Sequence, residues 1–316
     1  MRVFSAADLA KVLDYGALID RIDEFFRIGC TVPVRHHHHI DVPNEDGTTL
    51  LLMPAWREGD FVGVKVVTIF PGNRTRALPS VMGTYLILSG KTGQPLASMD
   101  GKELTVRRTG AASALASRYL SRPDSRHLLM VGTGSLAPHM IRSHAAARPI
   151  DTVTIWGRTP AHADALAKSL AGDSFSVAVT RDLEAGVRAA DIISCATLAV
   201  QPLVFGRWLK AGQHVDLVGG YRTDMRETDD DAIAKVSLYV DTRDGALKEG
   251  GDLTIPIAAG VITAAAVKGD LFDLARGTVA GRQRADDITL FKSVGTAVED
   301  LAAAALAAER LGAQVT

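Results

Sequence analysis

Residues 127–137 read His-Leu-Leu-Met-Val-Gly-Thr-Gly-Ser-Leu-Ala, and this stretch decides the fold. Its apolar residues 128–131 predict a short buried strand, and the glycines after them predict a tight turn into a helix. Gly132 permits the turn, Gly134 lets the backbone approach a pyrophosphate, and Ala137 keeps the helix close to its strand. The amino end of that helix supplies N–H donors and the positive end of a dipole. The pattern therefore predicts a dinucleotide-binding turn; a glycine turn that binds nothing is the alternative.

The sequence after this turn alternates between strands and helices. A second apolar strand, Val153–Trp156, follows at the spacing of a βαβ unit, and residues 135–147 between the two strands are compatible with a helix. This alternation predicts an α/β fold of the doubly wound type, with a parallel sheet covered by helices. We expect strands at 128–131, 152–156, 175–180, 191–195 and 214–218.

The sequence before the turn is of a different kind. Ser5 and Asp8 form a capping box, and Asp14 can cap a second helix that ends at Gly29. From residue 32 to 106, strand-like segments and turn signals follow one another without crossover helices, which predicts a mostly antiparallel sheet. Its strand-like segments are 50–53, 61–70, 83–88 and 95–99, and Ala-rich helices are expected over 109–120 and 297–311.

Length and composition limit the possible classes of protein. A chain of 316 residues exceeds what one core usually serves, so two domains are expected. With 47% hydrophobic and 22% charged residues the composition is globular, and a net charge of −1 without basic blocks makes nucleic acid an unexpected partner. The longest apolar run, residues 253–267, is too short to span a bilayer, and the first residues lack the apolar core of a signal peptide. We therefore expect a soluble cytoplasmic protein without membrane attachment.

The cysteines and the histidine run give no metal site. Cys30 and Cys195 lie far apart and lack metal-ligand spacing. Four adjacent histidines, His36–His39, would point alternately to opposite faces of a strand, so they cannot all ligate one metal ion. No metal is predicted; partial metal binding and a hydrogen-bonding wall beside a substrate pocket remain as roles for this run.

The end of the second strand bears on the choice of coenzyme. In dinucleotide-binding folds an acidic residue about 20 residues past the glycines binds the ribose hydroxyls of NAD. Here that position reads Gly157-Arg158-Thr159, with no carboxylate. An arginine followed by a hydroxyl suits the 2′-phosphate of NADP through charge and a planar donor fork. NADPH is therefore expected to be preferred, with NADH possible; Arg158 as a solvated loop residue is the alternative.

Four further stretches resemble the ornithine cyclodeaminase/μ-crystallin family, and the resemblance covers nearly the whole chain. They are Val32-Pro33-Val34-Arg35, then Gly63-Val64-Lys65-Val66-Val67 with Phe70-Pro71-Gly72-Asn73, then 104–114 (Leu-Thr-Val-Arg-Arg-Thr-Gly-Ala-Ala-Ser-Ala), and 286–295 (Asp-Asp-Ile-Thr-Leu-Phe-Lys-Ser-Val-Gly). The resemblance implies a Rossmann domain over 108–289. It also implies a split α+β domain, 1–107 with 290–316, that binds substrate and forms a homodimer.

The resemblance places the substrate site on Arg35, Lys65 and Arg108. This choice is chemically reasonable, because guanidinium groups can fork onto a substrate carboxylate and an ammonium can pair with it or donate a proton. Each residue has a simpler alternative: Arg108 could be a surface residue at a helix start, and Lys65 could extend to solvent. By strand alternation Lys65 points to the face opposite Val64 and Val66, and only the resemblance makes that face the pocket.

The resemblance also implies which residues line the coenzyme. Besides Arg158, we expect Thr109, Gly132, Thr133, Gly134, Ser135, Leu136, Thr159, Cys195, Ala196, Thr197, Val218, Ser293 and Gly295. Cys195 is expected to be a small packing residue rather than a nucleophile.

One departure from the family decides between its activities. Cyclodeaminases carry their catalytic aspartate just after the glycine pair, where this chain has Tyr221; the nearest carboxylate is Asp224, in a pattern similar to ketimine reductases. The resemblance therefore implies an NAD(P)H-dependent reductase of cyclic imino acids, with Lys65 and Asp224 as catalytic residues and Tyr221 shaping the substrate pocket. A surface tyrosine is the alternative at 221. The rival activities are ornithine cyclodeaminase, an alanine or N-methyl-amino-acid dehydrogenase, and a μ-crystallin-like ligand-binding protein.

Overall fold

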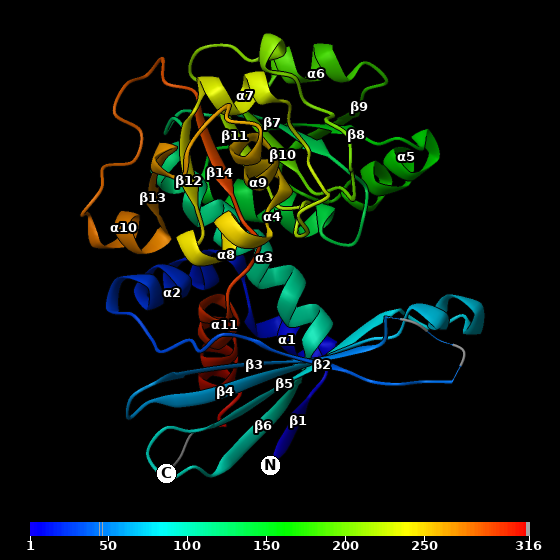
Figure 1. Cartoon of the computed structure of the whole chain (residues 1–316), viewed down its shortest axis with the longest axis vertical. Coiled ribbons are helices and arrows are strands. Elements are labelled where there is room, and N and C mark those ends of the chain that lie inside the picture. Colours follow the sequence, from blue (N-terminus) through cyan, green and yellow to red (C-terminus); the bar gives the residue numbers. More distant parts are fainter. Residues whose placement is uncertain (44, 46, 314–316) are drawn as a thin grey trace. The chain divides into compact units, whose positions relative to one another are not determined.

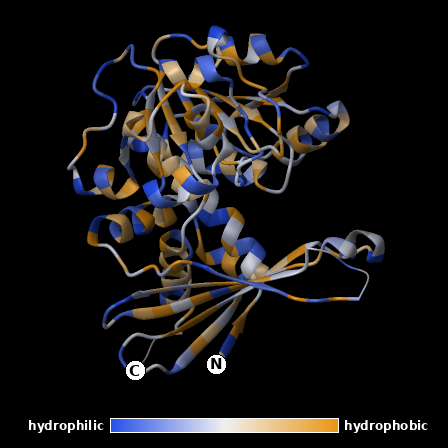
Figure 2. Cartoon of the chain, in the orientation of Figure 1, coloured by the Kyte–Doolittle hydropathy of each residue, from blue (hydrophilic) through white to orange (hydrophobic). Residues whose placement is uncertain are grey.

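The computed structural model describes residues 1–43, 45 and 47–313. The chain divides into two compact units, of which unit 1 comprises Met1–Arg108 and Ala297–Thr316 and unit 2 comprises Thr109–Thr296. The predicted α/β class with a doubly wound domain and a smaller α+β part is confirmed. Figure 2 shows that hydrophobic residues concentrate on the strands of both units.

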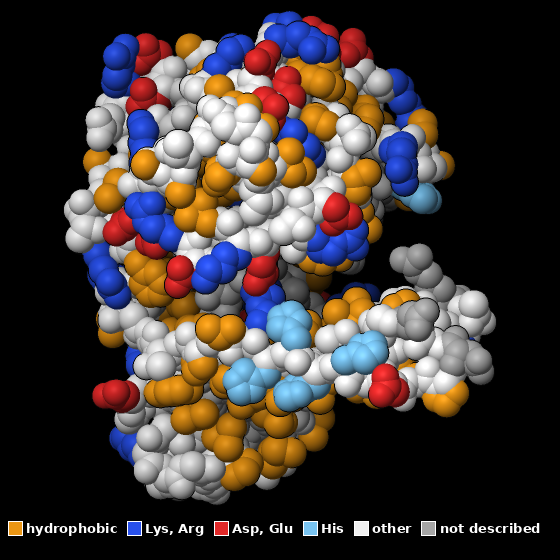
Figure 3. Space-filling model, viewed as in Figure 1, with side chains coloured by type: hydrophobic (Ala, Val, Ile, Leu, Met, Phe, Trp, Pro, Cys, Tyr) orange, Lys and Arg blue, Asp and Glu red, His pale blue; other side chains and the backbone are white. Residues whose placement is uncertain are grey.

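Unit 1 is built on a six-stranded sheet (Figure 1). Neighbouring strands are antiparallel, as predicted, except that the short first strand pairs in parallel with the sixth. In sheet order the strands are β1 (Arg2–Phe4), β6 (Pro95–Asp100), β5 (Val81–Ser89), β4 (Phe61–Ile69), β3 (Thr49–Arg57) and β2 (His36–His39). The four histidines form the exposed edge strand β2, and Figure 3 shows a group of histidine side chains on the surface.

The helices α1, α2 and α11 belong to unit 1, and the first two begin at the predicted caps. Ser5 and Asp8 form the capping box of α1 (Ala6–Val12). Asp14 accepts a hydrogen bond from the N–H of Ala17 at the start of α2 (Tyr15–Ile28), which ends at Gly29 with a φ of 93°. The last helix, α11 (Ala297–Arg310), contacts α2 and the strands β3 to β6. Most of the buried residues of α11 are alanines, and their small side chains let the helix approach the sheet closely. A 3₁₀ segment, Pro71–Arg76, follows β4.

Helix α3 (Gly101–Leu120) begins eight residues before the predicted start at 109, so the prediction of strand-like structure to residue 106 was wrong there. The Asp100 side chain, at the end of β6, accepts a hydrogen bond of 2.7 Å from the N–H of Glu103 and so caps the helix. The sequence around Val106 looked strand-like because its polar residues interrupt the helical pattern. Those polar residues include Arg108, which the structure buries.

Unit 2 is built on an eight-stranded sheet in which every pair of neighbours is parallel. In sheet order the strands are β13 (Val267–Asp270), β12 (Ser237–Val240), β14 (Thr289–Lys292), β11 (His214–Leu217), β10 (Ile192–Cys195), β7 (His127–Val131), β8 (Thr152–Trp156) and β9 (Ser176–Val179). The five predicted strands are confirmed. The other three, β12 to β14, were not predicted, and in two of them a lysine interrupts the apolar pattern. Because β14 belongs to this sheet, the expected domain boundary at residue 290 falls inside a strand, and residues 290–296 lie in unit 2.

Helices cover both faces of this sheet (Figure 1), and a separate hydrophobic cluster forms beneath each face. The helices are α4 (Ala137–Ala147), α5 (Pro160–Ser169), α6 (Leu183–Ala189), α7 (Asp230–Lys235), α8 (Arg243–Glu249), α9 (Gly251–Ala258) and α10 (Leu271–Arg276), with 3₁₀ turns at Gly206–Trp208 and Ala264–Ala266. The apolar run 253–267 forms most of α9 and the loop after it. No helix in the described ranges is both long and apolar enough to cross a membrane.

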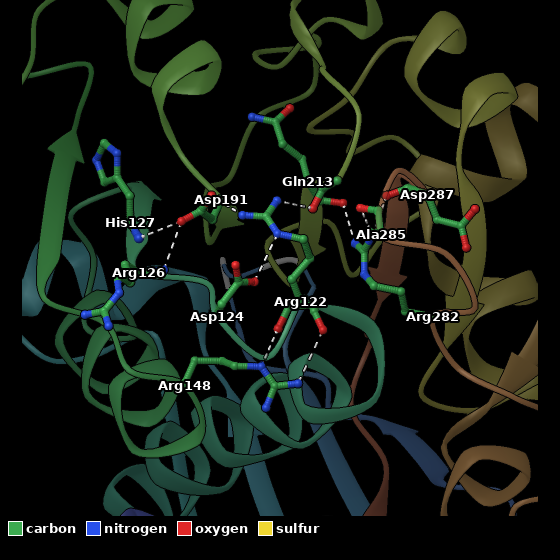
Figure 4. Close-up of polar contacts among 12 residues, drawn as sticks. Arg122, Asp124, Arg126, His127, Arg148, Asp191, Gln213, Arg282, Ala285 and Asp287 are labelled. Carbon is green, nitrogen blue, oxygen red and sulfur yellow. Dashed lines mark hydrogen bonds and ion pairs between the residues drawn. The ribbon is translucent and has the colours of Figure 1, made fainter.

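An arginine network closes the amino edge of this sheet (Figure 4). Asp191, just before β10, accepts hydrogen bonds from Arg122 at 2.8 Å and from the N–H groups of Arg126 and His127 at 2.9 and 3.0 Å. Arg148 and Arg282 donate instead to backbone carbonyls, including those of the last turn of α3. These guanidinium groups add hydrogen bonds to carbonyls at the end of a helix, so the network is structural.

Gly63 makes room for the ring of Tyr85, which is fully buried on the neighbouring strand. A Cβ atom at Gly63 would lie 2.0 Å from Oη and 2.6 Å from Cζ of Tyr85. We expect Gly63→Ala to lower the free energy of unfolding by about 1–3 kcal/mol, measured by denaturant titration. Gly16→Ala is the control, because its added Cβ would make only an ordinary contact, 3.6 Å from Oδ1 of Asp14. Equal stability of the two variants would contradict the close packing of Tyr85.

Candidate active site

A row of side chains crosses the inner face of the unit 1 sheet. Met53, Lys65 and Tyr85 are paired across β3, β4 and β5, and residues directly opposite in antiparallel strands point to the same face. This face is the one that α11 covers. Along β4 the residues Phe61, Gly63, Lys65 and Val67 are buried and alternate with half-buried valines, so the predicted orientation of Lys65 is confirmed.

Two cations and two carboxylates meet at this row, far apart in sequence and all buried. The ammonium of Lys65 donates to Oδ1 of Asp300 at 3.0 Å, and Nε of Arg108 donates to the same oxygen at 3.0 Å. Arg108 also forms an ion pair with Glu299, the residue before Asp300 on α11. Because Lys65 is only 5% exposed and Arg108 only 8%, the solvent and surface alternatives for both residues were wrong.

Burial and charge set the proton equilibria of this cluster. Burial opposes ionisation of Asp300, but the positive charges of Arg108 and Lys65 hold the pKa of its carboxyl below the ordinary value. Burial also lowers the pKa of Lys65, with help from Arg108 and against the attraction of Asp300. A lysine whose pKa is lowered gives up a proton more readily, which suits a general acid.

Arg35 directly precedes β2, whose His36 pairs with Leu52 in the antiparallel ladder with β3. The side chain of Arg35 is half-buried, and its role in substrate binding stays a prediction.

Sequence reasoning missed three polar members of this row and cluster: Tyr85, Glu299 and Asp300. The hydroxyl of Tyr85 is buried and has no hydrogen-bond partner among the described residues, which leaves a donor for a ligand. Glu299 and Asp300 are the two carboxylates at the start of an otherwise Ala-rich helix. The sequence signal that could have revealed them is a pair of adjacent acidic residues in a helix otherwise rich in alanine and leucine.

In unit 2 the glycine turn has the geometry that a dinucleotide needs. Gly132 has a φ of +120°, and a Cβ there would lie 2.6 Å from the carbonyl oxygen of Ala196. At Gly134, by contrast, a Cβ would meet no atom within 4 Å, so the backbone is open to a ligand. The turn leads into α4, whose amino end follows directly. These residues fit a pyrophosphate group held by backbone N–H donors.

The other predicted coenzyme residues of unit 2, apart from Thr109, follow the carboxyl ends of neighbouring strands. This edge is where open parallel sheets bind their ligands. Ala196 and Thr197 follow β10, Val218 follows β11, and Ser293 and Gly295 follow β14. Thr133, Ser135 and Leu136 belong to the turn after β7, and Arg158 and Thr159 follow β8. Thr109 lies within α3, half-buried next to Arg108.

Cys195 and Arg158 illustrate the two extremes of exposure at this edge. Cys195 is fully buried in a hydrophobic cluster, and burial raises the pKa of its thiol well above the usual value, so it packs rather than reacts. Arg158 is exposed, and within the described part of the chain its guanidinium forms no ion pair.

Buried carboxylates hold the loops of this edge, and sequence reasoning missed them as well. Oδ2 of Asp241, at the end of β12, accepts hydrogen bonds from Ser293 Oγ and from the N–H groups of Val294 and Gly295 at 2.7–3.0 Å. Burial raises the pKa of Asp241 despite these donors. Glu227, also fully buried, plays a similar part between β10 and β11.

Tyr221 and Asp224 lie at the surface of unit 2. Tyr221 is 50% exposed. Asp224 is exposed and forms a two-pronged ion pair with Arg222, with both distances 2.9 Å. Hydrogen bonds from Arg222 lower the pKa of Asp224, so this carboxylate is ionised at neutral pH. The catalytic role of Asp224 and the pocket role of Tyr221 remain predictions.

Among residues 1–43, 45 and 47–313, no three His, Cys, Asp or Glu side chains are grouped so as to hold a metal ion. The geometry thus defines an α/β protein with a dinucleotide-binding turn in unit 2 and a buried, charge-balanced cluster in unit 1.

Comparison with known proteins identifies the family. The profile of the "Ornithine cyclodeaminase/mu-crystallin family" matches residues 3–314, so the chain belongs to this family, as its sequence predicted. A Δ1-pyrroline-2-carboxylate reductase of Paracoccus denitrificans is 41% identical over 297 residues, which cover 92% of this chain and 94% of that protein.

Solved structures agree in fold. The Δ1-pyrroline-2-carboxylate reductase of Thermococcus litoralis, in complex with NADH and L-proline, superposes with a TM-score of 0.91 at 33% identity, covering 99% of this chain and 98% of that one. An archaeal alanine dehydrogenase dimer with bound NAD gives a TM-score of 0.90 at 26% identity, with coverage of 100% and 97%.

The charge balance at Asp300 provides a test of the cluster. Asp300→Asn removes the shared partner of two buried cations, and we expect it to lower the free energy of unfolding by about 3–5 kcal/mol in chemical denaturation. The double variant Lys65→Met with Asp300→Asn is the control, because it removes one cation as well and leaves Arg108 paired with Glu299. It should recover part of the loss. A double variant as unstable as the sum of the single changes would contradict the coupling.

Proposed function

We propose that this protein is an NAD(P)H-dependent reductase of small cyclic imino acids. Its substrate would be Δ1-pyrroline-2-carboxylate, which gives L-proline, or Δ1-piperideine-2-carboxylate, which gives L-pipecolate. The observation that carries the proposal is the buried cluster of Lys65, Arg108, Glu299 and Asp300. The similarity to two Δ1-pyrroline-2-carboxylate reductases supports the choice of substrate.

Charge balance favours this class of substrate. The cluster holds two positive and two negative groups, so a ligand of zero net charge disturbs it least. A protonated cyclic imine with a 2-carboxylate has this property, since it carries one positive and one negative group. Lys65 uses one of its three N–H donors for Asp300, and others remain for the substrate carboxylate.

In this proposal the chain's own residues orient and protonate the substrate. Arg35 and Arg108 bind the carboxylate, and Lys65 helps to bind it and keeps the imine nitrogen protonated, which makes C2 a better hydride acceptor. The lowered pKa of Lys65 suits that proton transfer. Holding the carboxylate fixes the position of C2, so orientation contributes to the rate. The coenzyme supplies the hydride that reduces C2. Asp224 would assist through water.

The assembly and the location of the protein are also proposals. A homodimer is supported by the dimeric alanine dehydrogenase of similar fold. The outer face of β4, with half-buried Val62, Val64 and Val66, offers an apolar surface for it. We further propose that the enzyme acts in the cytoplasm.

The activity itself is the first experiment. With purified protein, we expect rapid oxidation of NADPH or NADH by Δ1-pyrroline-2-carboxylate, followed by absorbance and by detection of L-proline. Lys65→Met should lower kcat/KM by at least about 100-fold. A parallel assay of L-ornithine with NAD should release no ammonia.

Other outcomes of that experiment identify the rivals. Ammonia and proline from ornithine would mean a cyclodeaminase, and would show that Tyr221 does not exclude that reaction. Turnover only with a 2-oxo acid and ammonia or methylamine would mean an amino-acid dehydrogenase. Tight ligand binding without any turnover would mean a μ-crystallin-like binding protein.

Coenzyme choice is tested at Arg158, for which we propose contact with the 2′-phosphate of NADPH. A charge-assisted hydrogen bond contributes about 1.5–3 kcal/mol. Arg158→Ser should therefore raise the KM for NADPH about 10-fold or more and change the KM for NADH by less than about 3-fold. Arg188→Ser is the control, since Arg188 is an exposed arginine of the same unit that pairs with Glu184. Equal effects on both coenzymes would refute the assignment.

A further inference from the structure

The loops after β10 and β11 lie against each other with no spare room. A Cβ at Gly219, two residues past β11, would lie 2.1 Å from the carbonyl oxygen of Thr197 and 2.4 Å from its nitrogen. Thr197 also borders the glycine turn, because a Cβ at Gly132 would lie 3.3 Å from its methyl carbon. A small shift of Thr197 would therefore disturb three neighbouring strand ends, those of β7, β10 and β11.

One side chain joins these loops. Oε1 of Glu227 accepts hydrogen bonds from the N–H and from the hydroxyl of Thr197, both at 2.7 Å. Oε2 of the same carboxylate accepts one from the N–H of Gly219 at 2.9 Å. The two oxygens of a single fully buried carboxylate thus set the distance between the loops.

Glu227 is itself held firmly. Oδ1 of Asp252, at the start of α9, accepts hydrogen bonds from the N–H groups of Glu227 and Thr228 at 2.7 and 3.2 Å. The carbonyl oxygen of Glu227 accepts from the N–H groups of Leu203 and Val204, in the loop that follows Thr197. Lys292 lies 2.9 Å from Oδ2 of Asp252, at ion-pair distance, and offsets part of the buried negative charge.

The excess of buried negative charge around Glu227 lowers the stability of the fold. Two fully buried carboxylates, Glu227 and Asp252, face one ammonium, that of Lys292. Burial and Asp252 raise the pKa of Glu227 to about 7, although Lys292 and the donors of Thr197 oppose the shift. An ionised carboxylate in such surroundings lowers the stability of the protein unless its oxygens accept hydrogen bonds. The hydrogen bonds that the Glu227 carboxylate accepts all come from the two loops.

We propose that Glu227 is a positioning residue for the coenzyme, which acts by fixing Thr197 and Gly219 relative to the glycine turn. The inference rests on the proposed function, because it takes this edge of the sheet to bind a nicotinamide coenzyme. Because Glu227 is fully buried, it would act through the two loops and not by contact with coenzyme or substrate. Its carboxylate binds the donors of Thr197 and Gly219 and so holds the backbone of both loops in one conformation before the coenzyme binds. Binding of the coenzyme then does not have to order these loops.

The test is the binding of NADH and NADPH to the full chain, followed by fluorescence of the reduced nicotinamide without imine substrate. Glu227→Gln is nearly isosteric, but its amide N–H₂ must face an N–H or O–H donor of one loop. We expect its dissociation constant to rise about 10-fold or more. Thr197→Val removes only the hydroxyl donor and should give a smaller rise of the same sign.

The control is Asp216→Asn. Asp216 is a fully buried carboxylate of β11 that accepts from Ser194 and contacts His144 and makes no hydrogen bond to the two loops. Its loss should lower stability and leave the dissociation constants within about 3-fold. Thermal unfolding of each variant, measured without coenzyme, separates loss of fold from loss of binding.

Each outcome has one meaning. If the unaltered protein binds neither coenzyme, the proposed function fails. If it binds coenzyme and Glu227→Gln binds equally well, the positioning role is overturned. Equal weakening in Glu227→Gln and Asp216→Asn would also overturn it, as an unspecific effect of losing a buried carboxylate. If Glu227→Gln does not fold, Thr197→Val decides, and normal binding by that variant overturns the proposal.

Discussion

Two buried cations must be balanced by two buried carboxylates, and unit 1 is arranged around that requirement. An isolated charge in the interior would cost far more than a domain can spare. Lys65 comes from β4, Arg108 from α3, and Glu299 with Asp300 from α11. The C-terminal helix therefore has to return to the sheet that the N-terminal third builds. The split character of this unit is a consequence of charge pairing as much as of apolar packing.

Buried carboxylates also organise unit 2, but there their partners are backbone N–H donors and not cations. Short strands in a parallel sheet end in loops whose N–H groups have no ladder partners. Asp241 satisfies those after β14, and Glu227 satisfies those after β10 and β11. At the opposite edge of the sheet arginines satisfy carbonyls (Figure 4). Side chains thus hold loops at each edge, and at the carboxyl edge Gly134 leaves an open approach to the backbone.

Local signals in the sequence were sufficient for much of this structure. The capping box of α1, the glycine turn and the alternation around Lys65 each depend on residues a few positions apart, and each was confirmed. The start of α3 and the strands β12 to β14 were missed, because their patterns are short or are broken by polar residues that the fold buries. The partners of Lys65 and Arg108 could not be deduced, since those contacts join residues 235 and 191 positions apart. Family resemblance identified the cations without their counter-ions.

The late position of Glu299 and Asp300 affects the order in which a growing chain can fold. Unit 2 is one continuous segment, Thr109–Thr296, and it is complete before either carboxylate is synthesised. At about 5–20 residues per second, the roughly 190 residues after Arg108 take about 10–40 s to make. During that time the strands of unit 1 exist without the helix that covers them and without the charges that neutralise Lys65 and Arg108. The order of synthesis therefore favours folding of unit 2 first. The N-terminal part of unit 1 can complete its fold only after α11 has been synthesised.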